Sequence, residues 1–193
     1  MEHETPPLSP AEIGRIGRRI DRPVVLVGMM GVGKTTVGRK LASLLDLPFV
    51  DADEEIERAA RLTIPEIFAS FGEPYFRDGE RRVIARLVGQ GGMVDRKILA
   101  TGGGAFVDPE TRALLRQHAI SVWLDSDIET LVDRVGRKDN RPLLRNGDPR
   151  EILIRLREDR RPFYEQAAIH VISGNHPHQH TAHAILKAID AWL

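Results

Sequence analysis

Val24–Thr36 reads VVLVGMMGVGKTT, and this stretch decides how the 193-residue sequence folds. It begins with an apolar run rich in valine, which is typical of a buried parallel strand. Gly28–Thr35 then matches G-x-x-x-x-G-K-[ST], whose glycines let backbone N–H groups surround a phosphate at the start of a helix. The alternative is a glycine-rich turn with a solvated lysine, but the motif follows an apolar strand and opens an amphipathic helix. We therefore predict a site for a nucleoside triphosphate.

This loop is expected to bind the phosphates of ATP. Lys34 should reach the β- and γ-phosphates, and the Thr35 hydroxyl should ligate Mg²⁺. The residues expected to bind ATP here are Gly31, Val32, Gly33, Lys34, Thr35 and Thr36. The motif indicates that a nucleotide is bound, but it leaves open what is done with it.

Short apolar runs alternate with helical stretches along the rest of the chain. Strands are expected at Val24–Val27, Pro48–Val50, Lys97–Ala100, Ile120–Leu124 and Ile169–Ile172. Strands separated by helices imply a parallel sheet with right-handed crossovers, covered on both faces. We predict an α/β fold, the three-layer P-loop NTPase fold of the nucleoside-monophosphate-kinase-like kind, with five parallel strands. Ligands of such sheets bind beyond the carboxyl ends of the strands.

Helix starts and domain limits follow from local signals. Thr63 with Glu66 and Ser126 with Glu129 are candidate capping boxes, and Asp108 and Asp148 each precede a proline at a helix start. Residues 1–20 are interpreted as a partly disordered N-terminal extension, in which 11–20 form a short, loosely packed helix. Residues 21–193 are expected to form a single domain.

Composition narrows the possible functions. Lysine plus arginine and aspartate plus glutamate each number 28, so no overall positive field favours nucleic acid or an anionic membrane. There is no cysteine, which excludes disulfides, thiolate metal sites and cysteine nucleophiles. Apolar runs are too short to span a bilayer. We expect a cytoplasmic protein, a monomer, without nucleic-acid or membrane partners.

The class of nucleotide-binding protein can be narrowed further. A GTPase would need a guanine-reading N-K-x-D segment, which the sequence lacks. A motor ATPase would normally carry adjacent acids after an apolar strand, whereas the strand at 97–100 is followed by glycines. These features favour a kinase with a compact acceptor next to the γ-phosphate.

Three further groups of residues describe that acceptor. Asp51 and Asp53 could support a magnesium-bound water and accept a proton, although the pair alone is more typical of a helix N-cap. Gly102–Gly104 either lets backbone N–H groups approach a ligand or forms a tight turn. Arg77 and Arg160 are each typical of a solvated helix face, but together in one pocket they would indicate an anionic acceptor such as a carboxylate.

Taken together, these motifs resemble the shikimate kinase family from about Val24 to Leu193. The segments that carry the resemblance are GMMGVGKTT (28–36), DAD (51–53), FR (76–77), GGGA (102–105), RPLL (141–144) and R-x-P-x-Y (160–164). The resemblance implies a kinase that uses MgATP to phosphorylate the 3-hydroxyl of shikimate, in aromatic amino acid biosynthesis.

The resemblance also implies roles for single residues. Asp53 would contact the ring hydroxyls next to the reacting oxygen, and Asp51 would support Mg²⁺ through water. The substrate carboxylate would be held by Arg77 and Arg160, and the ring hydroxyls by the backbone of Gly102, Gly103 and Gly104. Arg141 would reach the nucleotide phosphates from a mobile lid at about 138–149, and Arg134 would lie against adenine. The implied catalytic residues are Lys34, Asp53 and Arg141, and the substrate-binding region spans about 51–90.

One segment departs from the family pattern. Where many members place arginines beside a proline, this chain has NHPHQH at 175–180, so the adenine contacts of this segment are not assigned. The four histidines at 176, 178, 180 and 183 could bind a metal, but a solvated loop leading into the last helix is favoured.

Two rival functions remain open. A related gluconate-type kinase would share the phosphate loop but should lack the combination of Asp53, Arg77, Gly102–Gly104 and Arg160. A non-catalytic nucleotide-binding module would have lost Lys34, Asp53 or Arg141, and all three are present.

Overall fold

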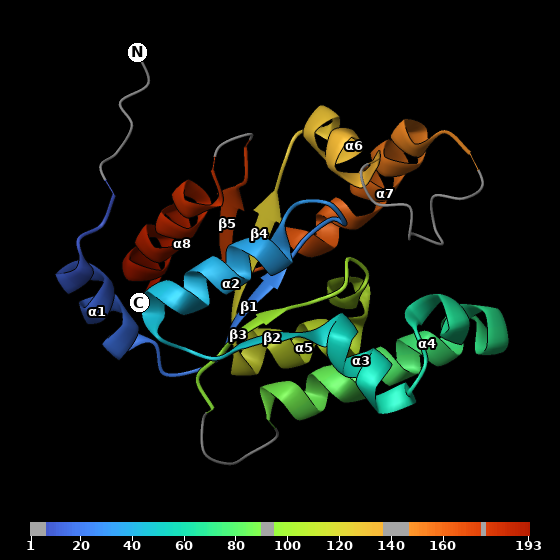
Figure 1. Cartoon of the computed structure of the whole chain (residues 1–193), viewed down its shortest axis with the longest axis horizontal. Coiled ribbons are helices and arrows are strands. Elements are labelled where there is room, and N and C mark those ends of the chain that lie inside the picture. The colour runs from blue at the N-terminus through green and yellow to red at the C-terminus, as the bar shows by residue number, and fades with distance from the viewer. Residues whose placement is uncertain (1–6, 90–94, 137–146, 175–176) are drawn as a thin grey trace.

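The computed structural model describes residues 7–89, 95–136, 147–174 and 177–193. Arg141 and most of the predicted lid at 138–149 lie outside these residues. Figure 1 shows a twisted sheet with helices on both faces. In chain order the elements are α1 (Pro10–Arg19), β1 (Val24–Val27), α2 (Lys34–Leu45), β2 (Phe49–Asp51), α3 (Ala52–Ala60), α4 (Ile64–Val88), β3 (Ile98–Ala100), the 3₁₀ turn η1 (Ala105–Val107), α5 (Pro109–His118), β4 (Ile120–Asp125), α6 (Ile128–Gly136), α7 (Pro149–Tyr164), β5 (Ile169–Ile172) and α8 (His178–Trp192).

Five strands form one sheet in the order β2-β3-β1-β4-β5, and every neighbouring pair is parallel. The predicted five-stranded parallel sheet is therefore confirmed. The bounds of β2 differ from the predicted ones by one residue at both ends, and those of β3 and β4 by one residue at one end. Pro48 stands just outside β2 because it has no N–H to pair, and its carbonyl accepts the N–H of Ile98 at 2.9 Å.

The central strand, β1, aims the phosphate loop at one rim of the sheet. Its four residues are fully buried, and Val24 pairs with Ile98 of β3 on one side and Ile120 of β4 on the other. Because β1, β2 and β3 are parallel neighbours, their carboxyl ends lie side by side. The loop after β1, the acids after β2 and the glycines after β3 therefore meet at this rim, where parallel sheets bind ligands.

Helices complete the layers on either face. On one face α2 and α8 pack together, and α1 lies against both. On the other face α5 packs against β4 and contacts α4, while α6 and α7 form a pair above the sheet (Figure 1). Among the helices of the described residues, none combines the length and apolar character that a membrane crossing requires.

The first helix, α1, belongs to the main core. Ile16 and Ile20 are 0% and 1% exposed and pack in the same cluster as the central strands. The backbone N–H of Leu8 donates to Nδ1 of His183 at 3.1 Å, and Arg15 forms an ion pair of 2.9 Å with Asp190. The expectation of loose packing is therefore wrong for this helix, because its isoleucine face docks between α2 and α8.

Local signals located most helix starts. The capping box of Thr63 and Glu66 is confirmed, as are the N-caps at Asp108 and Asp148. The box predicted at Ser126 is wrong, because the N–H of Ser126 donates to Asp125 and holds this residue at the strand end. Asp127 caps α6 instead, accepting the N–H and O–H of Thr130 at 2.8 and 2.7 Å.

The long helix α4 bends sharply near its beginning. Gly72 has φ 79° and ψ 174°, which is outside the helical region, and Pro74 follows within the same helix. Beyond the bend, Phe76 and Val83 join Ile56 and Ile67 in a second hydrophobic cluster, separate from the main core. This second cluster fixes α3 and α4 against each other next to the rim of the sheet.

Replacement of Ile16 by alanine tests whether α1 is part of the cooperative domain. We expect Ile16→Ala to lower the free energy of unfolding by roughly 3 kcal/mol, since a fully buried isoleucine leaves a cavity. Urea unfolding followed by circular dichroism measures the change. Ile172→Ala is the matched control, because Ile172 is 71% exposed and should cost less than about 1 kcal/mol. Equal losses in the two variants would contradict the packing of α1.

Candidate active site

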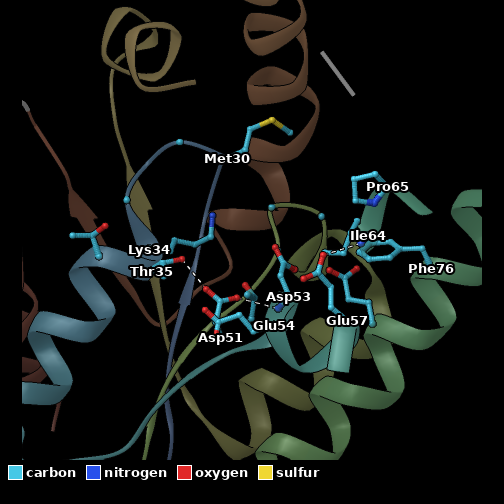
Figure 2. Close-up of a pocket in the computed structure, with 18 of the residues that line it drawn as sticks. Met30, Lys34, Thr35, Asp51, Asp53, Glu54, Glu57, Ile64, Pro65 and Phe76 are labelled. Atoms are coloured by element: carbon cyan, nitrogen blue, oxygen red, sulfur yellow. Dashed lines mark hydrogen bonds between the residues drawn. The ribbon is translucent and has the colours of Figure 1, made fainter. Parts of the chain in front are cut away.

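A cavity of about 680 Å³ opens at the carboxyl ends of β1, β2 and β3. Its volume is in the range usual for sites that bind small molecules and cofactors. Figure 2 shows Lys34 and Thr35 on one side of it, facing Asp51 and Asp53. The predicted site residues that line it are Gly31, Gly33, Lys34, Thr35, Thr36, Asp51, Asp53, Arg77, Gly102, Gly103, Gly104, Arg134 and Arg160. Val32 does not line it, because its side chain is buried in the core.

The loop from β1 to α2 has a backbone that requires glycine. Gly28, Gly31 and Gly33 have φ of 136°, 82° and 100°, in the region that L side chains rarely adopt. A Cβ at Gly28 would lie 2.3 Å from the carbonyl oxygen of Leu124, so a side chain there would collide with the backbone of β4. The chain can therefore leave β1 at this angle only through a glycine.

Lys34 lies across the mouth of this loop. Its Nζ donates to the carbonyl oxygens of Gly28 at 2.8 Å and Met29 at 2.9 Å, and the residue is 8% exposed. The ammonium group is thereby held over the loop at the start of α2, where the helix dipole also favours a negative ligand. This arrangement can bind the phosphates of a nucleotide.

Asp51, the last residue of β2, links this strand to the phosphate loop. The Thr35 hydroxyl donates to Oδ2 of Asp51 at 2.8 Å, and Oδ1 of Asp51 accepts the backbone N–H of Asp53 at 3.0 Å (Figure 2). Asp51 therefore caps α3 and contacts the phosphate loop with the same carboxylate. The two interpretations of the acid pair, an N-cap and a site residue, both fit this position.

Asp53 points into the cavity in an environment that disfavours its charge. Burial, followed by the nearby carboxylates of Asp51 and Glu80, raises the pKa of Asp53 from 3.8 to about 6. Its Oδ1 is buried and has no hydrogen-bond partner in the described part of the chain. A carboxylate with such a pKa and an open hydrogen-bonding position can accept a proton from a bound hydroxyl near neutral pH.

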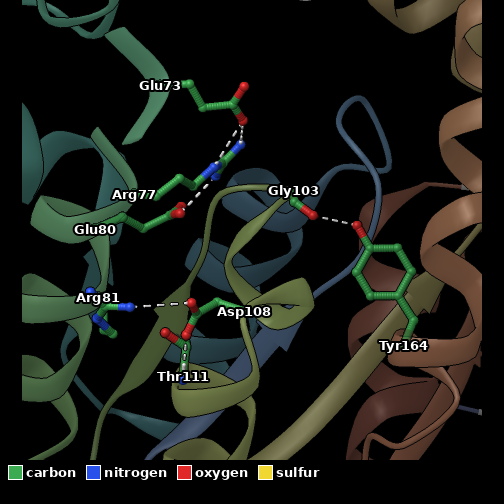
Figure 3. A network of polar contacts seen from close by, with 8 residues as sticks. All are labelled: Glu73, Arg77, Glu80, Arg81, Gly103, Asp108, Thr111 and Tyr164. Atoms are coloured by element: carbon green, nitrogen blue, oxygen red, sulfur yellow. Dashed lines mark hydrogen bonds and ion pairs between the residues drawn. The ribbon is translucent and has the colours of Figure 1, made fainter. Parts of the chain in front are cut away.

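Arg77 projects from α4 and is held by two acids. Its guanidinium binds Glu80 at 2.7 Å and Glu73 at 3.2 Å, as Figure 3 shows. A Cβ at Gly104 would lie 2.4 Å from Nη1 of Arg77. The guanidinium therefore packs directly on the glycine loop after β3, and that loop must be free of side chains at this point.

Glu80 is a residue that the sequence interpretation missed. It is 2% exposed, and burial raises its pKa, which the nearby Arg77 opposes. Its Oε1 has no hydrogen-bond partner among the described residues and lies 2.7 Å from where a Cβ of Gly102 would be. The available signal was its position three residues after Arg77 on one helix, which places the two side chains on the same face.

Arg160 enters the cavity from the opposite side, in the last part of α7. It is 8% exposed, and its Nη1 is buried without a hydrogen-bond partner in the described ranges. Tyr164, one turn later, donates its hydroxyl to the carbonyl of Gly103 and is 1% exposed (Figure 3). Arg77 and Arg160 thus line one cavity around the same glycine loop, as an anionic acceptor would require.

Arg134 joins the phosphate loop to the segment after β5. Its guanidinium donates to the carbonyl of Val32 and to the carbonyl of Gly174, both at 3.1 Å. Arg141, the second arginine predicted on this side, lies outside the described residues.

The histidines near the C-terminus do not converge. His178 lines the cavity, His180 is exposed on the surface, and Nδ1 of His183 accepts the N–H of Leu8. Within the described ranges, no group of three or more histidine and acidic side chains is arranged to hold a metal ion. His176 lies outside those ranges.

Comparison with known proteins places this chain in a family. The family model described as shikimate kinase matches residues 30–190. A shikimate kinase from Novosphingobium aromaticivorans is 72% identical over 193 residues, which are 100% of both chains, and one from Caulobacter vibrioides is 56% identical over 168 residues, 87% of this chain and 82% of that protein. A solved structure, shikimate kinase from Acinetobacter baumannii in complex with shikimate, has a TM-score of 0.84 at 38% identity and covers 91% of this chain and 97% of that one. The chain therefore belongs to the shikimate kinase family.

Proposed function

We infer that this protein is an ATP-dependent kinase that transfers the γ-phosphoryl group of ATP to the 3-hydroxyl of shikimate. The products are shikimate 3-phosphate and ADP, in the biosynthesis of aromatic amino acids. Family membership supports the reaction. The observation that carries it in this chain is a single cavity with a phosphate loop at one end and two arginines, Arg77 and Arg160, at the other. No described contact favours gluconate or a non-catalytic role.

At the nucleotide end, we propose that the backbone of Gly31–Thr36 surrounds the phosphates. Lys34, now bonded to two loop carbonyls, would turn its ammonium group toward the β- and γ-phosphates. Arg134, which borders the loop at Gly33, would lie along the nucleotide, and Arg141 would reach its phosphates from the predicted lid. These positive groups would balance the charge that develops on the transferred group.

Thr35 and Asp51 are the residues we propose for Mg²⁺. Their oxygens lie 2.8 Å apart at the edge of the phosphate loop. Mg²⁺ prefers oxygen ligands and usually binds proteins through one or two side chains, several waters and substrate phosphates. This pair therefore suits the ion without a larger protein cluster. When bound, Mg²⁺ neutralises charge on the β- and γ-phosphates.

At the acceptor end, we propose that Arg77 and Arg160 bind the carboxylate of shikimate. The unpaired Nη1 of Arg160 provides a donor for it, and Arg77 adds a second guanidinium next to the glycine loop. Gly102, Gly103 and Gly104 would bind ring hydroxyls through their backbone. The open Oδ1 of Asp53 would accept the hydrogen bond of the 3-hydroxyl.

The proposed transfer is direct. The oxygen of the 3-hydroxyl forms a bond to the γ-phosphorus while the bond from that phosphorus to the bridging oxygen of ADP breaks. The proton of the hydroxyl passes to Asp53, whose pKa of about 6 suits it to accept a proton at neutral pH. Positioning and charge neutralisation supply most of the catalysis in such reactions. The monomeric state and the cytoplasmic location stay predictions.

The first test of this function is an acceptor comparison. We expect ADP release from MgATP to depend on shikimate and to be near background with quinate, gluconate or no acceptor. A coupled assay of ADP release measures this. Equal turnover with gluconate would contradict the proposed acceptor, and binding of ATP without turnover on any acceptor would contradict the proposed transfer.

Replacement of Asp53 by asparagine should raise the stability of the protein while it lowers the activity. The pKa of Asp53 is raised from 3.8 to about 6 in the fold, so the ionised side chain destabilises the folded state above pH 6. We expect Asp53→Asn to raise the free energy of unfolding by about 1–2 kcal/mol at pH 8. The gain should disappear as the pH falls from 6 toward 4, because the wild-type side chain then becomes protonated in the fold.

The same variant should lose shikimate-dependent turnover while it keeps ADP binding. Urea unfolding at pH 8, 6 and 4, together with the coupled assay, gives both readouts. Glu165→Gln is the matched control, because Glu165 is exposed, pairs with Arg161 on the surface and does not line the cavity. A pH-independent change in stability for Asp53→Asn would contradict the buried, charge-crowded environment of Asp53.

Arg77→Ala and Gly104→Ala should damage the same contact by different routes. The first removes the guanidinium, and the second displaces it, because the new Cβ would lie 2.4 Å from Nη1 of Arg77. We expect each to raise the KM for shikimate by at least about tenfold, the effect of losing a hydrogen bond between charged groups. The KM for ATP should change little.

The double variant tests whether the two substitutions act on the same guanidinium. If both substitutions act on one guanidinium, the combined loss should be no larger than that of Arg77→Ala alone, as a double-mutant cycle of steady-state kinetics shows. Arg82→Ala is the control, since Arg82 lies on the same helix and pairs with Asp78 on the surface. Additive losses would mean that Gly104 acts independently of Arg77.

A further inference from the structure

His178, the first residue of α8, forms part of the wall of the cavity at its nucleotide end. A Cβ at Gly33 would lie 3.6 Å from Cε1 and 3.8 Å from Nδ1 of this imidazole. The ring therefore lies against the backbone of the phosphate loop. The same Cβ position is 3.7 Å from Nη1 of Arg134, so the imidazole and the guanidinium border Gly33 together.

The segment after β5, which precedes His178 in the chain, contacts the phosphate loop. The Ser173 hydroxyl donates to the carbonyl of Val32 at 3.3 Å. Arg134 donates to the same carbonyl and to that of Gly174, each at 3.1 Å. These bonds tie the end of β5 to the loop on the side where α8 begins. His178 lines the cavity at this place and borders Gly33 beside Arg134.

The ring has a polar atom without a partner. Nδ1 of His178 is buried and makes no hydrogen bond in the described part of the chain. Buried polar atoms are usually paired because leaving one unpaired costs free energy. His183, on the same helix, shows the usual situation, since its Nδ1 accepts the N–H of Leu8 at 3.1 Å. A bound ligand is therefore the natural partner of the open nitrogen in His178.

We propose that His178 binds the nucleotide, with Nδ1–H donating a hydrogen bond to a phosphate oxygen in the part that ATP and ADP share. The choice of a phosphate oxygen follows from the neighbouring Gly33, since the backbone N–H groups of such loops surround the α- and β-phosphates. The acceptor binds at the other end of the cavity, so His178 does not contact it. This inference rests on nucleotide binding at the phosphate loop, and it assigns the contact through which the histidine-rich segment acts.

Titration calorimetry with ADP tests the proposal on the full-length protein. We expect His178→Ala to weaken ADP binding by about tenfold, the effect of losing one hydrogen bond to a charged group. His178→Asn should restore most of the affinity, because its amide nitrogen can occupy the position of Nδ1. His178→Phe should not restore it, because the phenyl ring keeps the shape of the side chain but has no donor.

Two controls separate this contact from a general loss of structure. Shikimate affinity should be unchanged in all three variants, because the acceptor lies at the opposite end of the cavity. His180→Ala should bind ADP like the wild type, since His180 is exposed two residues farther along α8 and does not line the cavity.

The outcomes are distinguishable. Unchanged ADP affinity in His178→Ala overturns the proposal, and full rescue by His178→Phe overturns it in favour of packing by the ring. A wild-type protein that binds no ADP would instead overturn the proposed function. Loss of shikimate affinity together with ADP affinity in His178→Ala would show a structural role and also overturn the proposal.

Discussion

The close approach of the first residue after β1 to the backbone of β4 is the constraint on which the site depends. Gly28 passes so near the carbonyl of Leu124 that a side chain cannot be accommodated. The chain therefore turns at once after the central strand, and α2 begins within a few residues, with its amino end at the rim. Lys34, Thr35 and the loop N–H groups take their places from this turn, and the acids after β2 and the glycines after β3 are aligned with it by the parallel register.

Several buried polar side-chain atoms around the cavity have no hydrogen-bond partner among the described residues. The buried side-chain atoms without a partner in the described part of the chain belong to Asp53, Glu80, Ser126, Arg160 and His178, and all of these except Ser126 line the cavity. Other buried polar side chains outside the cavity, such as Ser121 and Ser173, make hydrogen bonds. Unpaired buried groups destabilise a fold. Their concentration in one cavity means that the protein holds donors and acceptors in place before the ligands arrive, which is the preorganisation that phosphoryl transfer needs.

Much of the fold and the phosphate loop could be predicted from the sequence, because their signals are local. A valine-rich strand, a glycine pattern and an acid before a helix can each be recognised without neighbours, and the parallel sheet follows from their alternation. The remaining features depend on contacts far apart in sequence. Glu80 reads as one more charge on a helix until its burial beside Gly102 is known. The isoleucines of α1 form an apolar face in sequence, but only the fold shows that α2 and α8 receive it. His178 reads as part of a solvated loop, and only the fold places it at the cavity beside Arg134 and Gly33.

The second hydrophobic cluster supports the part of the cavity that Arg77 lines. Ile56, Ile67, Phe76 and Val83 hold α3 and the bent α4 together, and the partly buried Leu87 packs against both clusters. The phosphate loop packs on the main core, whereas the part of α4 next to Arg77 packs in the small cluster and its later residues Ile84 and Val88 pack in the main core. Substitutions in the small cluster can therefore alter the part of the cavity around Arg77 while the phosphate loop keeps its support. In evolutionary terms, such a separation lets one ATP-binding scaffold acquire new acceptors by altering a few residues in a peripheral helical unit.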